Sequence, residues 1–281
     1  MHLISTRASR RRKCACAGWR KSRGGMMAKA IMYDSTKCIG CRACQVACKR
    51  WNDLPAEKTS LSPDWTNPPD LSPVTWNYIR FVGKNGENGF EWHFVSVRCM
   101  HCVDPPCARA CPVGAITKYE EGPVVINQEK CIGCRYCVAV CPFEVPRYDK
   151  ATGKVYKCHM CYDRIKEGLE PACVATCPTG ALSFGDRETL LSRARERAST
   201  VNGYLYGADE IEKGTSVFIV TKLPPAELGL PDAPKTYPLY LSIREYVRPL
   251  TGVGVAAVLL LAGLRVLFTR KREVAEKSGG E

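Results

Sequence analysis

The sequence predicts an α+β fold in which a cysteine-rich body of two similar modules is followed by a single C-terminal transmembrane helix. Three observations lead to this prediction. Sixteen of the 18 cysteines lie between residues 38 and 177 in four tight groups, which form an internal repeat of variable spacing. Short β-branched and aromatic runs between and after the groups are typical of short strands. A run of nineteen residues near the C-terminus, 250–268, carries a single charge.

The grouping of the cysteines indicates metal binding. A chain of 281 residues does not need disulfides to be stable, and disulfide-rich secreted domains are usually much smaller. The cysteines also fall at C-x-x-C spacing and not in scattered pairs. Four motifs contain them: Cys38, Cys41, Cys44 and Cys48; Cys99, Cys102, Cys107 and Cys111; Cys131, Cys134, Cys137 and Cys141; and Cys158, Cys161, Cys173 and Cys177.

The spacing favours [4Fe–4S] clusters. A C-x2-C-x2-C loop can wrap three corners of a cubane, and in two-cluster ferredoxins the fourth cysteine ligates the partner cluster. Motifs one and three keep the full C-x2-C-x2-C-x3-C pattern, and motifs two and four lengthen only the middle loop. Structural zinc is the alternative, but zinc sites use two separated C-x2-C pairs. We therefore expect four [4Fe–4S] clusters on sixteen cysteines, in two ferredoxin-like two-cluster modules.

Other residues near the motifs are assigned weaker roles. His101 and His159 lie inside motifs that already hold four cysteines, so we expect them beside the clusters or at the surface and not as ligands. Arg42, Arg98 and Arg135 lie next to ligands and either raise the cluster potentials by their charge or are simply solvated. We expect no catalytic residues and no nucleotide site, because no strand–G-x-G-x-x-G–helix unit is present.

The formal charge of +13 does not indicate nucleic-acid binding. Residues 1–25 hold eight of the basic residues and no acid, which leaves about +5 for the rest. Each oxidised all-cysteine cluster adds about −2, because four thiolates outweigh a +2 core, so the loaded body carries roughly −3. Residues 1–25 are interpreted as a disordered basic tail or a mis-assigned start, and its two cysteines, Cys14 and Cys16, are excluded as ligands.

Residues 28–223 are expected to form the four-cluster domain. Strands are predicted at 115–119 and 124–128 around a Glu-Glu-Gly-Pro turn, at 181–184 and at 216–222. The long insert contains a predicted hairpin, 74–98, whose strands 76–82 and 90–97 are joined by a Gly-Asn-rich loop. A short helix is predicted over 187–198, capped by Asp186.

The C-terminal part is expected to reach the membrane. Five prolines between 224 and 238 predict an extended linker over 224–248. A transmembrane helix is predicted over 249–269, since nineteen residues at about 1.5 Å each span close to the ~30 Å hydrocarbon core; a buried core helix is the alternative. Basic residues are more numerous after the span than before it, so residues 270–281 should be a cytoplasmic tail. The cluster domain would then lie on the outer, periplasmic face.

The stretch from Cys38 to Gly185 resembles a known family. The phrases KCIGCRACQVACKRWNDLP, RCMHCVDPPCARACP, KCIGCRYCVAVCPFEVPRYDK and YKCHMCYDRIKEGLEPACVATCPTGALSFGD are similar to the iron–sulfur (beta) subunits of membrane-bound formate dehydrogenase. These are four-cluster electron-transfer subunits within the dimethyl-sulfoxide-reductase superfamily.

The resemblance implies which cysteines share a cluster, which the spacing alone does not. Motif one pairs with four and motif two with three. The four implied ligand sets are Cys38, Cys41, Cys44 and Cys177; Cys158, Cys161, Cys173 and Cys48; Cys99, Cys102, Cys107 and Cys141; and Cys131, Cys134, Cys137 and Cys111. The clusters would form a line.

The resemblance also implies the partners. A molybdopterin (Mo or W) catalytic subunit would deliver electrons, and a membrane cytochrome b or quinone-reactive subunit in the lipid bilayer would receive them. The body would cross the membrane folded, carried by its catalytic partner. The alternative is the equivalent subunit of a polysulfide, thiosulfate, dimethyl sulfoxide or nitrite reductase, or of a hydrogenase. A stand-alone polyferredoxin is the different class of protein that remains.

Overall fold

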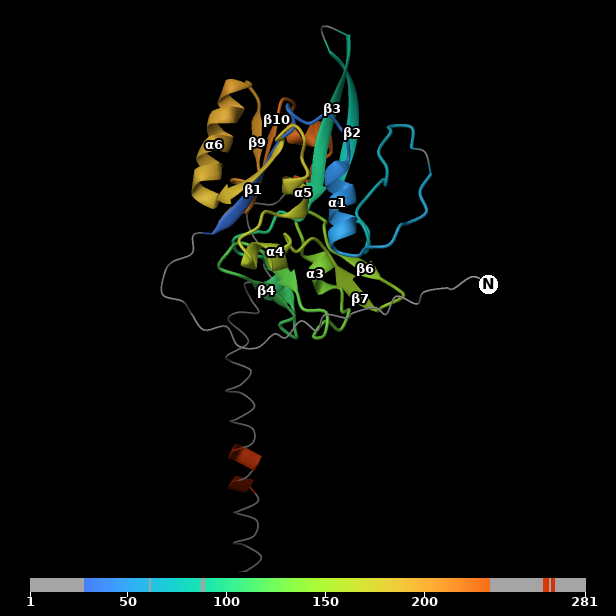
Figure 1. Ribbon diagram of the computed structural model, residues 1–281. Helices are drawn as coiled ribbons and strands as arrows, with labels where there is room; N and C mark the ends of the chain where they lie inside the picture. Colours follow the sequence, from blue (N-terminus) through green and yellow to red (C-terminus); the bar gives the residue numbers. More distant parts are fainter. Residues whose placement is uncertain (1–27, 61, 87–88, 233–259, 263, 266–281) are drawn as a thin grey trace, which may run out of the picture.

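The computed structural model describes residues 28–60, 62–86, 89–232, 260–262 and 264–265. Its body contains a four-stranded sheet in the order β8-β1-β10-β9. The strands are β1 (Lys29–Asp34), β8 (Leu182–Asp186), β9 (Tyr204–Tyr206) and β10 (Val217–Thr221). β1 pairs antiparallel with β8 and parallel with β10, so the two ends of the cysteine-rich stretch meet in one sheet (Figure 1).

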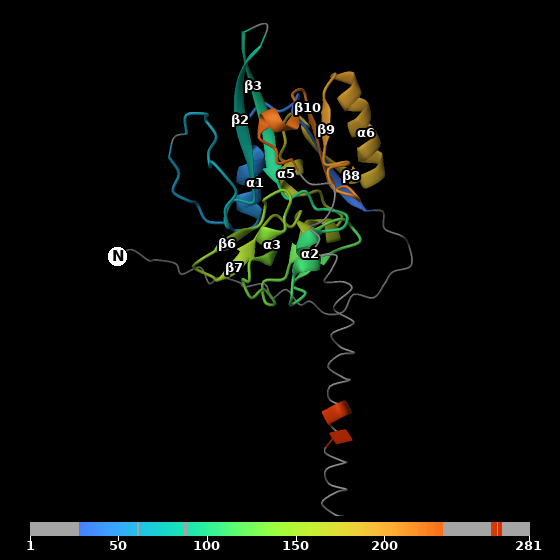
Figure 2. The same ribbon diagram turned by 180° about the vertical axis from the view of Figure 1, so that it is seen from behind.

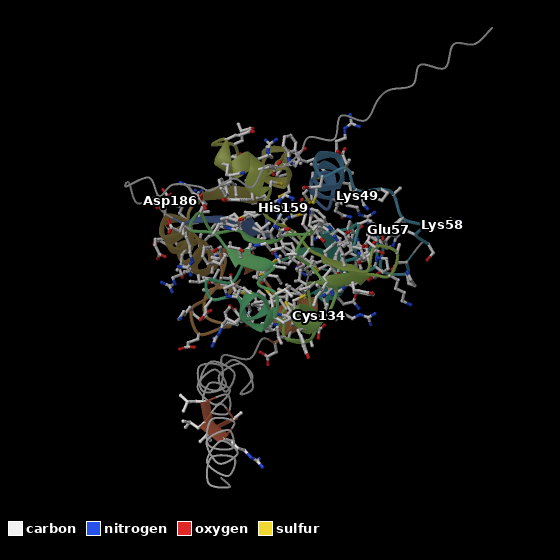
Figure 3. All side chains as sticks on the ribbon, turned by 90° about the horizontal axis from the view of Figure 1, so that it is seen from below. Lys49, Glu57, Lys58, Cys134, His159 and Asp186 are labelled. Atoms are coloured by element: carbon white, nitrogen blue, oxygen red, sulfur yellow. The ribbon has the colours of Figure 1, made fainter. Side chains whose placement is uncertain are left out.

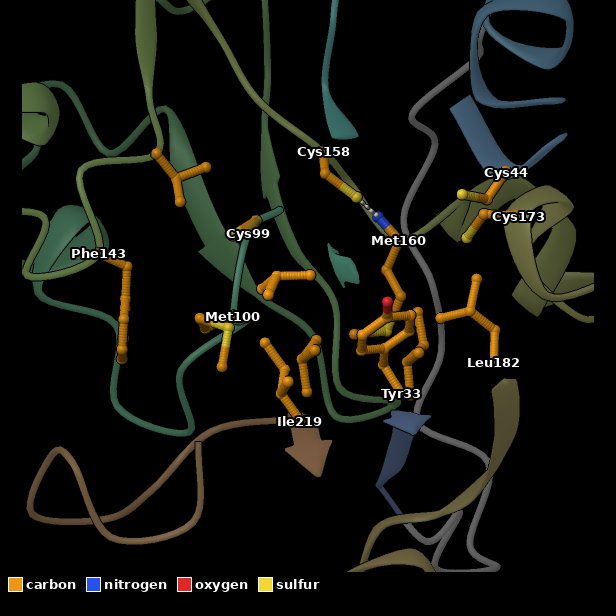
Figure 4. Close-up of a cluster of buried hydrophobic side chains, with 14 of the residues drawn as sticks. Tyr33, Cys44, Cys99, Met100, Phe143, Cys158, Met160, Cys173, Leu182 and Ile219 are labelled. Carbon is orange, nitrogen blue, oxygen red and sulfur yellow. Dashed lines mark hydrogen bonds between the residues drawn. The ribbon is translucent and has the colours of Figure 1, made fainter. Parts of the chain in front are cut away.

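The two faces of this sheet have different neighbours. Side chains alternate between the faces of a strand. The helix α6 (Arg187–Thr200) covers one face. A buried cluster there comprises Leu190, Leu191, Ala194 and Ala198 of α6, and Ala30, Met32, Phe218 and Val220 of the sheet. The opposite face, with Ile31, Tyr33, Val217 and Ile219, packs on the main core, which includes five buried motif cysteines (Figure 4).

The helix after β8 confirms the predicted helix but not its cap. α6 begins at Arg187, as expected. Asp186 occupies the N-cap position, but its carboxylate makes no capping hydrogen bond. It accepts a hydrogen bond from the ammonium of Lys29 at 2.6 Å instead. Lys29 lies on the neighbouring strand β1, so the local sequence around Asp186 does not reveal this partner.

A long hairpin projects from the body on the side of α1 (Ala43–Trp51) (Figures 1 and 2). Its strands β2 (Asn77–Gly86) and β3 (Gly89–Arg98) pair antiparallel along their whole length. The predicted hairpin is therefore confirmed. Its paired strands extend beyond the apolar runs 76–82 and 90–97 from which it was predicted. Its base delivers Arg98 directly to the first cysteine of motif two.

Shorter elements hold the other motifs. Two small hairpins are formed by β4 (Ile116–Lys118) with β5 (Val124–Ile126), which confirms the prediction, and by β6 (Arg147–Asp149) with β7 (Lys154–Tyr156), which the sequence analysis did not identify. The short helices are α2 (Pro106–Ala110), α3 (Tyr136–Ala139), α4 (Tyr162–Lys166) and α5 (Ala172–Ala175).

The body extends past residue 223 into the segment that was predicted to be a linker. Pro225–Leu228 form the 3-10 turn η1, and Leu228 and Leu230 are buried in the main core. The hydroxyl of Tyr206 donates to the carbonyl of Pro231 at 2.6 Å. Apolar burial thus extends the body past residue 223, because two of the seven residues after it are leucines that reach the core.

The predicted membrane span lies outside the described residues except for five. These five, 260–262 and 264–265, are helical, and Leu260, Leu261 and Leu264 are exposed. Within the part of the chain that the structure describes, no helix has the length and apolar character needed to cross a membrane. The basic tail 1–25, the rest of the linker and the tail 270–281 also lie outside the described residues.

Candidate metal centres

Three cavities in the body are each lined by four motif cysteines. The first is lined by Cys38, Cys41, Cys44 and Cys177. The second is lined by Cys99, Cys102, Cys107 and Cys141, and the third by Cys111, Cys131, Cys134 and Cys137. Each quartet joins two motifs, and each is one of the ligand sets that the family resemblance implies.

The remaining four motif cysteines, Cys48, Cys158, Cys161 and Cys173, form a fourth group. All four are buried. Burial and then the charge of Cys173 raise the pKa of Cys48 to about 11. Cys173 and Cys48 are also among the charges that raise the pKa of Cys161 to about 12, after burial. Charges interact in this way only over short distances, so these thiols are neighbours.

The four quartets are adjacent in a fixed order. Cys44 of the first quartet lies beside Cys173, which belongs to the buried fourth group. Cys158 of that same buried group lies near Cys99 (Figure 4). Cys107 of the next quartet interacts electrostatically with Cys137 of the last. We number the quartets along this line: quartet 1 contains Cys38, quartet 2 Cys48, quartet 3 Cys99 and quartet 4 Cys131.

The cysteine chemistry fits [4Fe–4S] clusters. All sixteen motif cysteines are free thiols. The three cavities are similar in size, with volumes of about 310, 340 and 320 Å³, open mouths included. Among the described residues, no three His, Cys, Asp or Glu side chains form a group that could hold a single metal ion.

The raised pKa values of the buried thiols also favour metal binding. Burial raises the pKa of Cys44 to about 12 and that of Cys137 to about 12. Neighbouring thiolates add to the increase in both cases. A thiolate, not a thiol, is the metal ligand. These sites would hold their ligand form with a compensating cation, and the iron of a bound [4Fe–4S] core would supply that charge.

Backbone conformation explains the glycine of the C-I-G-C loops. Gly40 and Gly133 both adopt positive φ, +66° and +67°. A Cβ at Gly40 would lie 2.7 Å from the Phe94 ring. A Cβ at Gly133 would lie 2.0 Å from the carbonyl oxygen of Gly153, in the loop between β6 and β7. The loops turn back around their cavities only because these positions lack a side chain.

Replacing Gly133 by alanine should cost more stability than replacing Gly153, because Gly153 has φ +68° but no atom within 4 Å of its ideal Cβ. Gly153→Ala carries the backbone strain alone, about 1 kcal/mol or slightly more. Gly133→Ala adds the clash with the Gly153 carbonyl and should also lower the iron content. Thermal unfolding and iron analysis of the two purified variants test this. Equal effects of the two substitutions would contradict it.

The two motif histidines are bound to protein groups. His101 is buried, and its Nδ1 accepts a hydrogen bond from the Val124 amide at 2.9 Å. His159 contacts the Asn52 side-chain oxygen through Nε2 at 2.7 Å and accepts from the Tyr162 amide through Nδ1. Figure 3 labels His159 together with Cys134, which lies near the edge of the body. Both imidazoles therefore form hydrogen bonds with protein groups.

The three arginines next to ligands differ in their surroundings. Arg42 lies over the Phe81 ring at 4.4 Å, and exposed Arg135 lies over the Tyr148 ring at 3.8 Å. Only Arg98 is buried, and its Nη1 donates to the sulfur of Cys173 at 3.1 Å. Sequence reasoning missed Lys157, which is buried and lines the cavity of quartet 3. The sequence feature that could have identified Lys157 is its position directly before Cys158.

Comparisons with known proteins agree with this chemistry. Two models described as "4Fe-4S dicluster domain" match residues 37–115 and 90–187. The chain is 40% identical over 244 residues to "Formate dehydrogenase, nitrate-inducible, iron-sulfur subunit" from Escherichia coli strain K12, covering 84% of this chain and 82% of the relative. It is 41% identical over 238 residues to "Formate dehydrogenase-O iron-sulfur subunit" from the same strain, covering 81% and 79%.

A further relative carries a different name. The chain is 34% identical over 292 aligned positions to "Hydrogenase-2 operon protein HybA" from Escherichia coli O157:H7, covering 89% of this chain and 87% of that protein. Its identity is lower than that of the two formate dehydrogenase subunits, although the coverage is slightly larger.

Proposed function

The chain belongs to the family of iron–sulfur subunits of formate dehydrogenase, and from this premise we propose that it relays electrons through four [4Fe–4S] clusters between a formate-oxidising catalytic subunit and a membrane quinone site. The single observation that carries the proposal is the line of four cysteine quartets. A bound cluster takes up and releases one electron at a time. No catalytic residue is proposed on this chain.

Each quartet is proposed to hold one cluster. Quartets 1, 3 and 4 line cavities of similar volume, and quartet 2 lies between quartets 1 and 3. Thiols of successive quartets interact in the order 1-2-3-4. The chain itself therefore keeps neighbouring sites close and separates the two ends.

The two ends of the line are the proposed entry and exit points. Cys41 in quartet 1 and Cys134 in quartet 4 are exposed, whereas every cysteine of quartet 2 is buried. Each exposed cysteine lies beside an exposed isoleucine, Ile39 with 62% and Ile132 with 63% of its surface accessible. These ends are where partner subunits would approach.

The proposed partners rest on the family resemblance in the sequence, and the relatives named as formate dehydrogenase subunits support a catalytic partner of that kind. One is a catalytic subunit that holds a molybdopterin centre with molybdenum or tungsten. The other is a membrane cytochrome b or another quinone-reactive subunit.

We further propose that residues 249–269 span the membrane once, with the cluster domain on the outer face and the C-terminus in the cytoplasm. The sequence of the segment and its flanking basic residues support this proposal. The exposure of Leu260, Leu261 and Leu264 on its described helical residues agrees with it.

A hydrogenase partner is the second candidate. The specific observation in its favour is the relative named as a hydrogenase-2 operon protein, which aligns with 89% of this chain. The cysteine quartets serve either partner equally, because they do not touch the substrate of the complex.

Electron transfer from formate to quinone tests the proposal. Membranes from a strain that lacks only this chain should lose formate-dependent quinone reduction, and the restored gene should return it. Formate oxidation with a soluble dye that accepts electrons from the catalytic subunit directly should persist. Quinone reduction from formate that continues without the chain would contradict the proposal, and loss of hydrogen-dependent reduction alone would favour the second candidate.

A further inference from the structure

A basic residue directly precedes the first cysteine of every motif. These residues are Lys37, Arg98, Lys130 and Lys157. Lys37 and Lys130 are exposed, and they precede the motifs that contribute three cysteines to the outer quartets 1 and 4. Arg98 and Lys157 are only 3% and 6% exposed, and they precede the motifs that supply the inner quartets 3 and 2. The same repeat position is thus solvated at the ends of the line and buried in its middle.

Arg98 reaches across the junction between the two inner quartets. Its backbone leads into Cys99 of quartet 3, but its Nη1 donates to the sulfur of Cys173 in quartet 2 at 3.1 Å. Its Nε donates to the hydroxyl of Ser96 at 2.9 Å. Its Nη2 is buried with no hydrogen-bond partner. The guanidinium is therefore held against quartet 2 and has donor capacity left there.

Lys157 crosses the same junction in the opposite direction. Its backbone leads into Cys158 of quartet 2, but its side chain lines the cavity of quartet 3. Its ammonium donates to the carbonyls of Val124 and Cys158. The two hydrogen bonds fix the charge at the edge of that cavity.

Among the residues that the structure describes, neither buried cation forms an ion pair with a carboxylate. An unpaired buried charge is very costly, so an anion must lie nearby. Burial alone would lower the pKa of Arg98, but the thiolates of Cys173 and Cys44 raise it. Burial would likewise lower the pKa of Lys157, but the thiolates of Cys99 and Cys107 raise it. Arg98 donates to the sulfur of Cys173 at 3.1 Å and Lys157 lines the cavity of quartet 3, so the cysteine quartets are the counter-ions of both cations.

We propose that Arg98 and Lys157 are positioning residues that raise the reduction potentials of the two inner clusters, Arg98 acting on the cluster of quartet 2 and Lys157 on that of quartet 3. The inference rests on the proposed function. Adding an electron to a buried, negatively charged group is unfavourable, and a fixed positive charge beside it offsets that cost. Arg98 and Lys157 thus keep the clusters of quartets 2 and 3 reducible, because water does not reach these buried sites to compensate the added negative charge.

Lys157→Gln and Arg98→Gln in the purified complex test the proposal, with potentials measured by spin resonance during a redox titration. Each substitution should lower the reduction equilibrium constant of one inner cluster by roughly tenfold, which is about 59 mV for a one-electron couple. Lys130→Gln and Lys37→Gln are matched controls, since they remove the same charge at the same repeat position in solvent. Their shifts should be several-fold smaller because water screens exposed charges.

Charge-preserving variants distinguish electrostatics from shape. Lys157→Arg and Arg98→Lys should stay near the wild-type potentials. Buried and exposed glutamine variants with equal shifts would overturn the proposal. If the neutral variants fail to assemble their clusters and the charge-preserving ones succeed, the charge requirement is supported; if both kinds fail at a position, shape and not charge is required there and the proposal is overturned. A wild-type complex without four clusters would instead contradict the proposed function.

Discussion

Replacing Cys177 by alanine should remove or damage the cluster of Cys38, Cys41 and Cys44, although these residues precede it by more than a hundred positions. The four side chains line one cavity, so the substitution leaves one corner of that site without a thiolate. We expect a loss of up to about four irons per chain, or conversion of one cluster to a three-iron form, since each [4Fe–4S] cube needs four ligands. Electron transfer from end to end should fall by orders of magnitude, because quartet 1 is a terminal site.

Two other substitutions identify the lost signal. The spin-resonance signal that disappears in Cys177→Ala should be the one that disappears in Cys41→Ala, which belongs to the same quartet. Cys161→Ala should remove a different signal, that of quartet 2. Cys14→Ala is the control, because this cysteine lies outside the motifs. A match between Cys177→Ala and Cys161→Ala would mean that motif four binds its own cluster and that the crossed pairing is wrong.

Ending the chain after Asp232 should release it from the membrane. This truncation removes the predicted span but keeps Leu228 and Leu230, which are buried in the core, and the bond from Tyr206 to the Pro231 carbonyl. An alkaline wash strips proteins that are held only by contacts with partners. The full chain should resist this wash, and the truncated chain should appear in the supernatant with its iron content unchanged.

A second variant keeps the chain length constant. Leu260→Arg combined with Leu261→Arg places two charges in the proposed span, at about 2.5–3.5 kcal/mol each near the centre of a helix. It should be washed off like the truncated chain, whereas Leu260→Ile combined with Leu261→Ile should not. If the full chain is itself removed by the wash, or the truncated chain resists it, the segment does not anchor the protein.

Local patterns predicted much of the fold. The hairpin of β2 and β3, the strands β4, β5, β8 and β10, and helix α6 all follow from alternation, turn residues and helix signals within a short window. The hairpin of β6 and β7 was missed because its three-residue strands, RYD and KVY, lack the apolar runs that mark β4 and β5. Its turn contains Gly153, whose carbonyl packs on Gly133, so its role is evident only in three dimensions.

Non-local features could not be derived from spacing. Nothing in the sequence of motif four says that Cys177 lies with Cys38, and that grouping came from the family resemblance. The cap predicted for Asp186 failed because Lys29, on a strand 157 positions away, forms a hydrogen bond with that carboxylate. Similarly, Lys37, Arg98, Lys130 and Lys157 occupy one repeat position, and only the packing of the two modules decides which of them are buried.

Metal analysis of the chain purified without air tests the central claim most directly. Four cysteine quartets predict about sixteen iron atoms per chain, a similar amount of acid-labile sulfide, and cubane spin signals from four centres on reduction. Zinc in place of iron, or far fewer irons with no such signals in protein that retains its fold, would contradict the account.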